Sequence, residues 1–273
     1  LNHPVNLAYE AATADLSDVN MIDPFHLDAY GVTTVNYNRD VEAFPVLVAI
    51  FDKILGSCPY KSPTDMGVNM AGLCITDNEA VMEASRQEII RRYYTALCDY
   101  KKGRASDETL RRLELLIKKA HVDLSARTVV RAALEKAEQT GKPAAAMELP
   151  DGRIITGKTS NLLGACSALL LNALKALAGQ PDDLHLVSPL AIDPIQHLKV
   201  DHLGNRSPLL HTDETLIALS ISAATNPEAE LAMEQLSKLR GCEVHSTVML
   251  SPVDERTFRR LGVNLTCEPR FRG

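Results

Sequence analysis

The chain has 273 residues, of which 45% are hydrophobic and 23% are charged, a composition that indicates a folded globular protein with one large or two modest domains. Its 29 basic and 35 acidic side chains give a net charge of −6, which argues against nucleic-acid and membrane-surface partners. A small phosphorylated ligand is compatible with this charge, because backbone N–H groups can bind phosphate in an acidic protein.

Cysteine spacing and hydropathy favour a cytoplasmic location. The six cysteines are scattered without a close pair, which is typical of reduced thiols and argues against a disulfide framework and a zinc site. The longest uncharged apolar stretch, residues 161–174, is shorter than the ~20 residues that span a bilayer, and no signal peptide is recognisable. Because the chain opens on Leu1 and runs directly into polar sequence, we expect a fragment of a longer protein.

The first 76 residues are polar and rich in turn-forming residues. One helix is expected here, with Asn38 as its candidate N-cap and its end near Leu55. Pro45 interrupts that span, so the helix either begins later or is kinked.

Residues 77–142 have a helical pattern almost throughout, and we predict three helices in this segment. Gly103 ends the first helix, and Ser106 caps the second. The third is expected to start at Ser125 and to end at Gly141. The segment is therefore interpreted as a helical insertion.

After this insertion the pattern changes to alternating strands and helices. Residues 144–149 and 153–156 predict a β-hairpin, and the apolar run 161–178 predicts a buried helix. Near the end, a strand at 244–250 and a second at 263–267 flank one helix, which implies parallel pairing. The predicted fold class is α/β, with a mixed or mostly parallel sheet and flanking helices. The expected divisions are a motif-rich segment packing on the C-terminal domain (1–76), the insertion (77–142) and the α/β domain (143–273).

One short motif matches the phosphate-loop pattern G-x-x-x-x-G-K-[ST], at residues 152–159. A phosphate loop follows a hydrophobic strand, whereas Gly152 here completes a Pro-Asp-Gly turn before a strand-like run. The pattern is thus compatible with a hairpin and helix cap or with an anion site. In the second case Lys158 and the amides around Thr159 and Ser160 would hold the anion.

The N-terminal segment concentrates acids, amides and histidines. If Pro4 begins a helix, Asn6 and Glu10 lie one turn apart on the same face. Such a density suits a polar pocket for hydrogen bonding and proton transfer, although caps and Asx turns would use the same residue types. The candidate ligand-binding and catalytic residues of this segment are Asn6, Glu10, Asp23, His26, Asn38, Arg39, Thr64 and Asp65.

A second polar stretch runs from Lys199 to His211. Gly204 could shape a loop that presents His202, Asn205 and Arg206, with Arg206 as a clamp for carboxylate or phosphate. Ordinary loop polarity explains the same residues.

The C-terminal strand 244–250 carries His245, which is either a satisfied core residue or a catalytic base. Ligands in parallel sheets gather at the carboxyl ends of strands, where Ser251 and Pro252 open a helix.

Several strings resemble uncharacterised protein family 0371, a family of large cytoplasmic bacterial proteins, over essentially the whole chain. They are HPVNLAYEAATAD (3–15), NMIDPFH (20–26), TVNYNRD (34–40), SPTDMGVN (62–69) and DHLG (201–204). The resemblance implies relatives about twice as long, so this chain is expected to be the C-terminal half. The other half is expected to be an α/β domain with a glycine-rich segment, ending in lysine, that is similar to a phosphate loop. The family implies no established reaction.

These observations predict part of an enzyme that binds a small phosphorylated or nucleotide-like substrate between this chain and its N-terminal domain. Glu10, His26 and His202 are the candidates for proton transfer, and Arg39 and Arg206 are those for charge stabilisation. The rival is a structural or oligomerisation domain without its own catalytic site. A homo-oligomer is expected, no metal site is predicted, and the cofactor is unknown.

Overall fold

The computed structural model describes residues 44–57, 78–119 and 122–271. The chain divides into two compact units, Leu1–Ala126 and Arg127–Gly273, and each is described by itself. The predicted division into three segments stays a prediction.

The described part of the first unit is helical. Helix α4 spans Phe44–Leu55, α6 spans Asn78–Lys101, and α7 spans Asp107–Lys119. Helices α6 and α7 pack on each other, and the 3₁₀ turn η2 covers Leu124–Ala126. The predicted end of the first helix near Leu55 is confirmed.

Local signals explain these boundaries. Gly103 follows α6 with a φ of 71°, a left-handed conformation that favours glycine. Ser106 caps α7 as predicted, because its Oγ accepts a hydrogen bond from the Thr109 amide at 3.3 Å. The helix predicted to start at Ser125 begins instead at Thr128. The hydroxyl of Ser125 donates to Asp123 Oδ2 at 2.6 Å and is used in the turn before that helix.

The second unit contains a four-stranded sheet in the order β2-β1-β3-β4. The strands are β1 (Ala144–Glu148), β2 (Ile154–Lys158), β3 (Glu243–Ser246) and β4 (Asn264–Cys267). Strand β1 is antiparallel to both β2 and β3, whereas β3 and β4 are parallel. The predicted hairpin, the parallel pair and the mixed α/β class are therefore confirmed.

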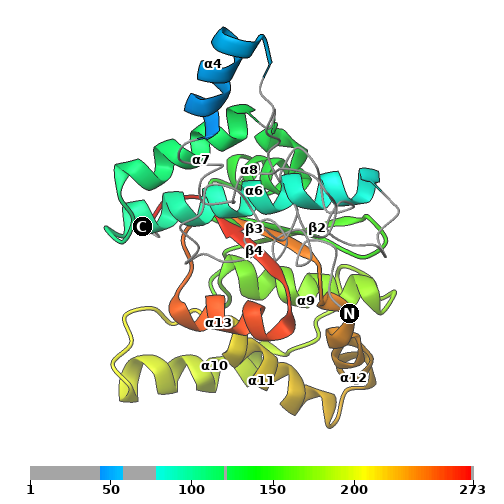
Figure 1. The fold of residues 1–273 in the computed structure, drawn as a ribbon. Coiled ribbons are helices and arrows are strands. Elements are labelled where there is room, and N and C mark those ends of the chain that lie inside the picture. The colour runs from blue at the N-terminus through cyan, green and yellow to red at the C-terminus, as the bar shows by residue number, and fades with distance from the viewer. Residues whose placement is uncertain (1–43, 58–77, 120–121, 272–273) are drawn as a thin grey trace. The chain divides into compact units, whose positions relative to one another are not determined.

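Helices cover both faces of this sheet. Figure 1 shows α8 (Thr128–Thr140) on one side and α9 (Ala165–Leu177) on the other. Because side chains alternate along a strand, Ala145 and Met147 of β1 join the core cluster that includes α9, whereas Ala146 packs with α8. Helix α9 is hydrophobic almost all round because it packs on the sheet with one side and on further helices with the other.

The layer beyond α9 consists of the helices α10 (Pro189–His197), α11 (Thr212–Ala223) and α12 (Pro227–Met233) and the 3₁₀ helix η4 (Glu234–Leu239). A π-helical turn, η3 (Leu198–His202), continues directly from α10. Helix α13 (Pro252–Leu261) connects β3 to β4. No helix in the described ranges has the length and hydropathy needed to cross a bilayer.

Two further predicted boundaries are wrong for local reasons. The strand predicted to reach residue 250 ends at Ser246, whose hydroxyl donates to the Val248 carbonyl at 2.8 Å and turns the chain. The helix predicted from residue 161 begins at Ala165, because Ser160 Oγ first accepts the Leu163 amide in a turn.

Gly157 allows α9 to approach β2 closely. A Cβ at this position would lie 2.2 Å from the Leu169 nitrogen and 2.7 Å from the Ala165 carbonyl oxygen, both backbone atoms of α9. We therefore expect Gly157→Ala to lower the free energy of unfolding by about 1–3 kcal/mol, measured by urea denaturation. The neighbouring Lys158→Ala is the control and should change stability by less than about 0.5 kcal/mol, since Lys158 is exposed. Equal stability of the two variants would contradict the packing role of Gly157.

Candidate functional site

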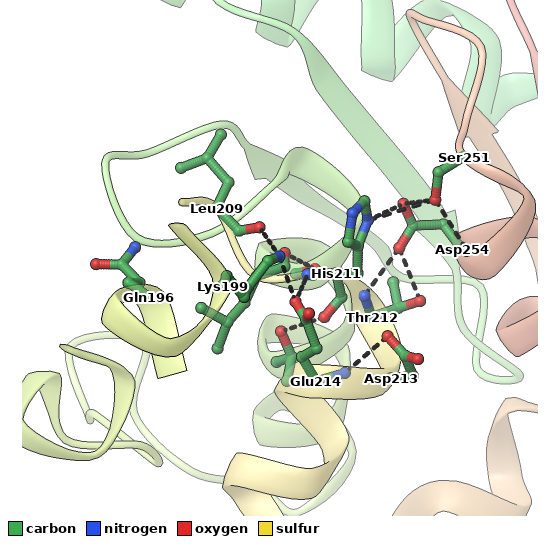
Figure 2. A network of polar contacts seen from close by, with 12 residues as sticks. Gln196, Lys199, Leu209, His211, Thr212, Asp213, Glu214, Ser251 and Asp254 are labelled. Carbon is green, nitrogen blue, oxygen red and sulfur yellow. Dashed lines mark hydrogen bonds and ion pairs between the residues drawn. The ribbon is translucent and has the colours of Figure 1, made fainter. Parts of the chain in front are cut away.

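The N-termini of α11 and α13 meet at the carboxylate of Asp254 (Figure 2). His211 occupies the N-cap position of α11, and Ser251 is the N-cap of α13, followed by Pro252 at the first helical position. Asp254 Oδ2 lies 3.0 Å from His211 Nδ1 and accepts a hydrogen bond from Ser251 Oγ at 2.8 Å. Oδ1 accepts bonds from the Thr212 amide at 2.8 Å and the Thr212 hydroxyl at 2.9 Å.

An ion pair between the buried Lys199 of η3 and the half-buried Glu214 of α11 adjoins His211. Glu214 Oε2 accepts hydrogen bonds from the His211 amide at 2.8 Å and from Lys199 Nζ at 2.6 Å. Lys199 Nζ also donates to the Leu209 carbonyl at 2.7 Å. We call the connected residues Lys199, His211, Thr212, Glu214, Ser251 and Asp254 the His211 cluster.

The cluster shifts the proton affinities of its central pair in opposite directions. The pKa of His211 is raised, chiefly by its hydrogen bond to Asp254, although burial acts against this shift. Burial alone would raise the pKa of Asp254, but hydrogen bonds from His211, Thr212 and Ser251 outweigh it and hold that pKa below its ordinary value. Asp254 is therefore ionised at neutral pH and can stabilise a protonated imidazole.

The geometry is that of a His–Asp dyad, not of a serine nucleophile with its base. In a catalytic triad the serine contacts the imidazole nitrogen opposite the aspartate. Here Ser251 Oγ lies 3.3 Å from the same Nδ1 that faces Asp254, and it also accepts the Asp254 amide at 3.2 Å. Nδ1 of His211 is thus held, whereas Nε2 bonds to no residue in the described part of the chain. The His211 side chain is 31% exposed, so the imidazole is in contact with solvent.

The predicted residues of the second polar stretch lie together on an exposed segment. Gly204 makes the predicted turn with a φ of 69°, and His202, Asn205 and Arg206 around it are exposed. The bond from Lys199 to the Leu209 carbonyl closes this segment and joins it to the His211 cluster. The N-terminal candidates, Asn6, Glu10, Asp23, His26, Asn38, Arg39, Thr64 and Asp65, lie outside the described residues.

The motif at residues 152–159 forms a hairpin, which is one of the two alternatives that the sequence allowed. The Thr159 amide donates to the Pro143 carbonyl at 2.9 Å, and the Ser160 amide donates to the Leu163 carbonyl at 3.0 Å. Both amides are therefore used within the chain, which favours the hairpin interpretation. Binding of an anion by Lys158 stays a prediction.

His245 is buried in the sheet. Its Nδ1 lies 2.9 Å from Thr266 Oγ1, and its Nε2 lies 3.3 Å from a carboxylate oxygen of Glu268. Burial lowers the pKa of His245 more than Glu268 raises it, so the imidazole is held neutral. These contacts favour the core alternative for this histidine.

Sequence reasoning missed the pairing of His211 with Asp254. The local signal was present, because each helix start places an acid three residues after its N-cap, in His211…Glu214 and in Ser251…Asp254. Such patterns predict helix starts but do not show that two starts meet. Within the described ranges, no three His, Cys, Asp or Glu side chains are grouped closely enough to hold a metal ion.

The fold and the His211 cluster together define a mixed α/β protein with a helix-capping His–Asp pair. Residues 1–121 match the family described as "Domain of unknown function DUF1846, N-terminal", and residues 125–273 match "Domain of unknown function DUF1846, C-terminal". The chain is 58% identical over 271 residues to UPF0371 protein cu0538 of Corynebacterium urealyticum, covering 99% of this chain and 54% of that protein. It is 56% identical over 271 residues to UPF0371 protein stu1377 of Streptococcus thermophilus, covering 99% of this chain and 55% of that protein. The chain belongs to the UPF0371 family.

These matches confirm the resemblance and correct one expectation drawn from it. The chain spans about half the length of the curated relatives it matches. It is not simply a C-terminal half, because its residues 1–121 match the N-terminal domain of the family.

Proposed function

We propose that the protein is an enzyme for a small phosphorylated or nucleotide-like substrate, with His211 as its acid–base group. The supporting observation is that buried Asp254 holds Nδ1 of His211 while the imidazole keeps access to solvent. A carboxylate on Nδ1 orients the ring and stabilises its protonated form, which is how histidine serves in proton transfer. The protonated form also attracts an anionic group.

The exposed segment that Lys199 joins to the cluster supplies the ligand-binding part of the proposal. Arg206 offers a planar fork of N–H donors that suits phosphate or carboxylate, and Asn205 offers an amide. His202 is retained as a further group for proton transfer. The N-terminal candidates are proposed for ligand binding or proton transfer from the sequence alone: Asn6, Glu10, Asp23, His26, Asn38, Arg39, Thr64 and Asp65.

A cytoplasmic location is also proposed. Cys98, Cys166, Cys242 and Cys267 are buried, and the scattered spacing of the six cysteines suits a reducing compartment. The proposed partners are the phosphorylated ligand, a domain supplied by a longer form of the protein, and further copies of the chain.

A ligand screen read at individual histidines tests the function. Nucleotides and sugar phosphates, with and without magnesium, are added to the 273-residue chain, and the imidazole signals and melting temperature are followed. A bound ligand should shift the His211 signal and raise stability by about 2.7 kcal/mol at a hundredfold excess over its Kd. His197 is the internal control, because it also pairs with an aspartate, Asp201, but its side chain is 77% exposed.

Arg206→Ala should weaken binding of the same ligand about tenfold without changing the melting temperature, because Arg206 is exposed. If no compound in the panel affects His211, or if His197 responds equally, the enzyme proposal fails. The structural-domain rival then gains support, since the cluster would serve only to join two helix starts.

A further inference from the structure

Lys199 and Lys175 are the lysines buried in the described part of the chain, and their surroundings differ. Lys175 Nζ donates to the backbone carbonyls of Asp182 and Leu184. Lys199 Nζ donates to a carbonyl and also to the Glu214 carboxylate. A buried lysine can be satisfied by carbonyls alone in this fold, so the additional carboxylate at Lys199 calls for its own explanation.

The position of Lys199 in the chain indicates what the pair does. Lys199 lies on η3, where the Leu203 amide donates to the Leu198 carbonyl at 3.0 Å and the Asn205 amide donates to the Lys199 carbonyl at 2.9 Å. π-helical turns are frequent at functional sites. Through this turn, the side chain of Lys199 reaches inward while the exposed residues beside it face solvent.

We propose that Lys199, acting through Glu214, is a positioning residue for His211. One oxygen, Glu214 Oε2, accepts both the Lys199 ammonium and the His211 amide, so the ammonium fixes the carboxylate that holds the backbone of His211 (Figure 2). The Leu209 carbonyl ties the preceding residues to the same ammonium. This positioning role matters for catalysis only if the proposed function of His211 is correct, and in that respect it rests on the proposed function.

The charges of the pair act on His211 in opposite senses. Among the described residues, Asp254 and Ser251 of the α13 N-terminus contact the imidazole, and Glu214 of α11 and Lys199 of η3 act on its pKa through their charges. Lys199 lowers the pKa of His211, whereas Glu214 raises it. The pair therefore holds His211 in place and has opposing effects on its proton affinity.

Nuclear magnetic resonance of the ligand-free 273-residue chain tests this inference. The His211 pKa and tautomer are measured in four variants. Lys199→Met should shift the pKa upward, and the isosteric Glu214→Gln should shift it downward while keeping an acceptor for the His211 amide. Glu214→Ala should add a loss of the single Nδ1–H tautomer, because that acceptor is removed. Lys175→Met, the matched control, should change only the melting temperature.

An unchanged pKa and tautomer in both the Lys199 and Glu214 variants would show that the pair is structural and would overturn the inference. A retained Nδ1–H tautomer in Glu214→Ala would overturn it as well. If Lys199→Met does not fold, the His211 pKa of Glu214→Gln tests the inference in its place. Because no ligand is involved, a positive result here with a silent ligand screen would reject the proposed function and leave the positioning role intact.

Discussion

Replacing Arg127 with alanine is expected to lower the free energy of unfolding of the second unit by about 3–5 kcal/mol, because an ion pair with a half-buried carboxylate and three further hydrogen bonds of a buried guanidinium would be lost. Arg127 is 1% exposed and forms an ion pair with Glu243 of β3. Its Nη2 donates to the carbonyls of Val244 and Asn264, both at 2.9 Å, and its Nε donates to Thr266 Oγ1 at 2.9 Å. One guanidinium thus joins the parallel strands β3 and β4 just before α8 begins.

Arg131→Ala is the matched control for Arg127. Arg131 lies one turn further along α8, its side chain is 77% exposed, and its ion pair with Glu135 is solvated. We expect a change of at most about 0.5 kcal/mol in urea unfolding followed by circular dichroism. Arg127→Lys should recover little of the loss, since an ammonium cannot reproduce the planar fork. A loss in Arg127→Ala as small as that in Arg131→Ala would contradict the role assigned to this guanidinium.

The sequence predicted the elements whose signals are local. Strand, helix and strand between residues 243 and 267 follow from Ser251 and Pro252 at one helix end and Gly262, with a φ of 73°, at the other. The sheet was predicted only as mixed or mostly parallel, because nothing local to β1 shows that it lies between β2 and β3. Pairing of segments far apart in the chain depends on tertiary packing.

The phosphate-loop match shows how one residue type can serve another purpose. Its second glycine, Gly157, is needed because the backbone of α9 leaves no room for a Cβ. A glycine in a phosphate loop and a glycine at a close helix–strand contact look the same in the sequence. Only the packing of α9 on β2 shows which role Gly157 has.

The candidate site was harder to predict than the fold. The His211–Asp254 contact joins residues 43 positions apart. Its two halves looked like ordinary helix starts, because capping and proton transfer use the same side chains.

Asp254→Ala is expected to lower the free energy of unfolding by about 3 kcal/mol at mildly acidic pH, since His211 and the Thr212 amide lose their charged acceptor. Asp254→Asn should cost less, because an amide oxygen can still accept the Thr212 bonds. Asp201→Ala, which removes the carboxylate of the exposed His197 pair, is the control and should leave stability unchanged within error.

The pH dependence of these variants separates the dyad from a simple helix cap. The folded pKa of Asp254 is depressed, so its stabilisation is present above the unfolded value of 3.8 and is lost as pH falls through the folded value. The folded pKa of His211 is raised, so its stabilisation is present below the unfolded value of 6.5 and is lost as pH rises through the folded value. The difference between the wild type and Asp254→Ala should therefore be largest between those two unfolded values and should shrink at alkaline pH, where His211 is neutral. A difference in urea unfolding that stays the same from mildly acidic to alkaline pH would mean that Asp254 only caps the two helices and does not stabilise a charged imidazole.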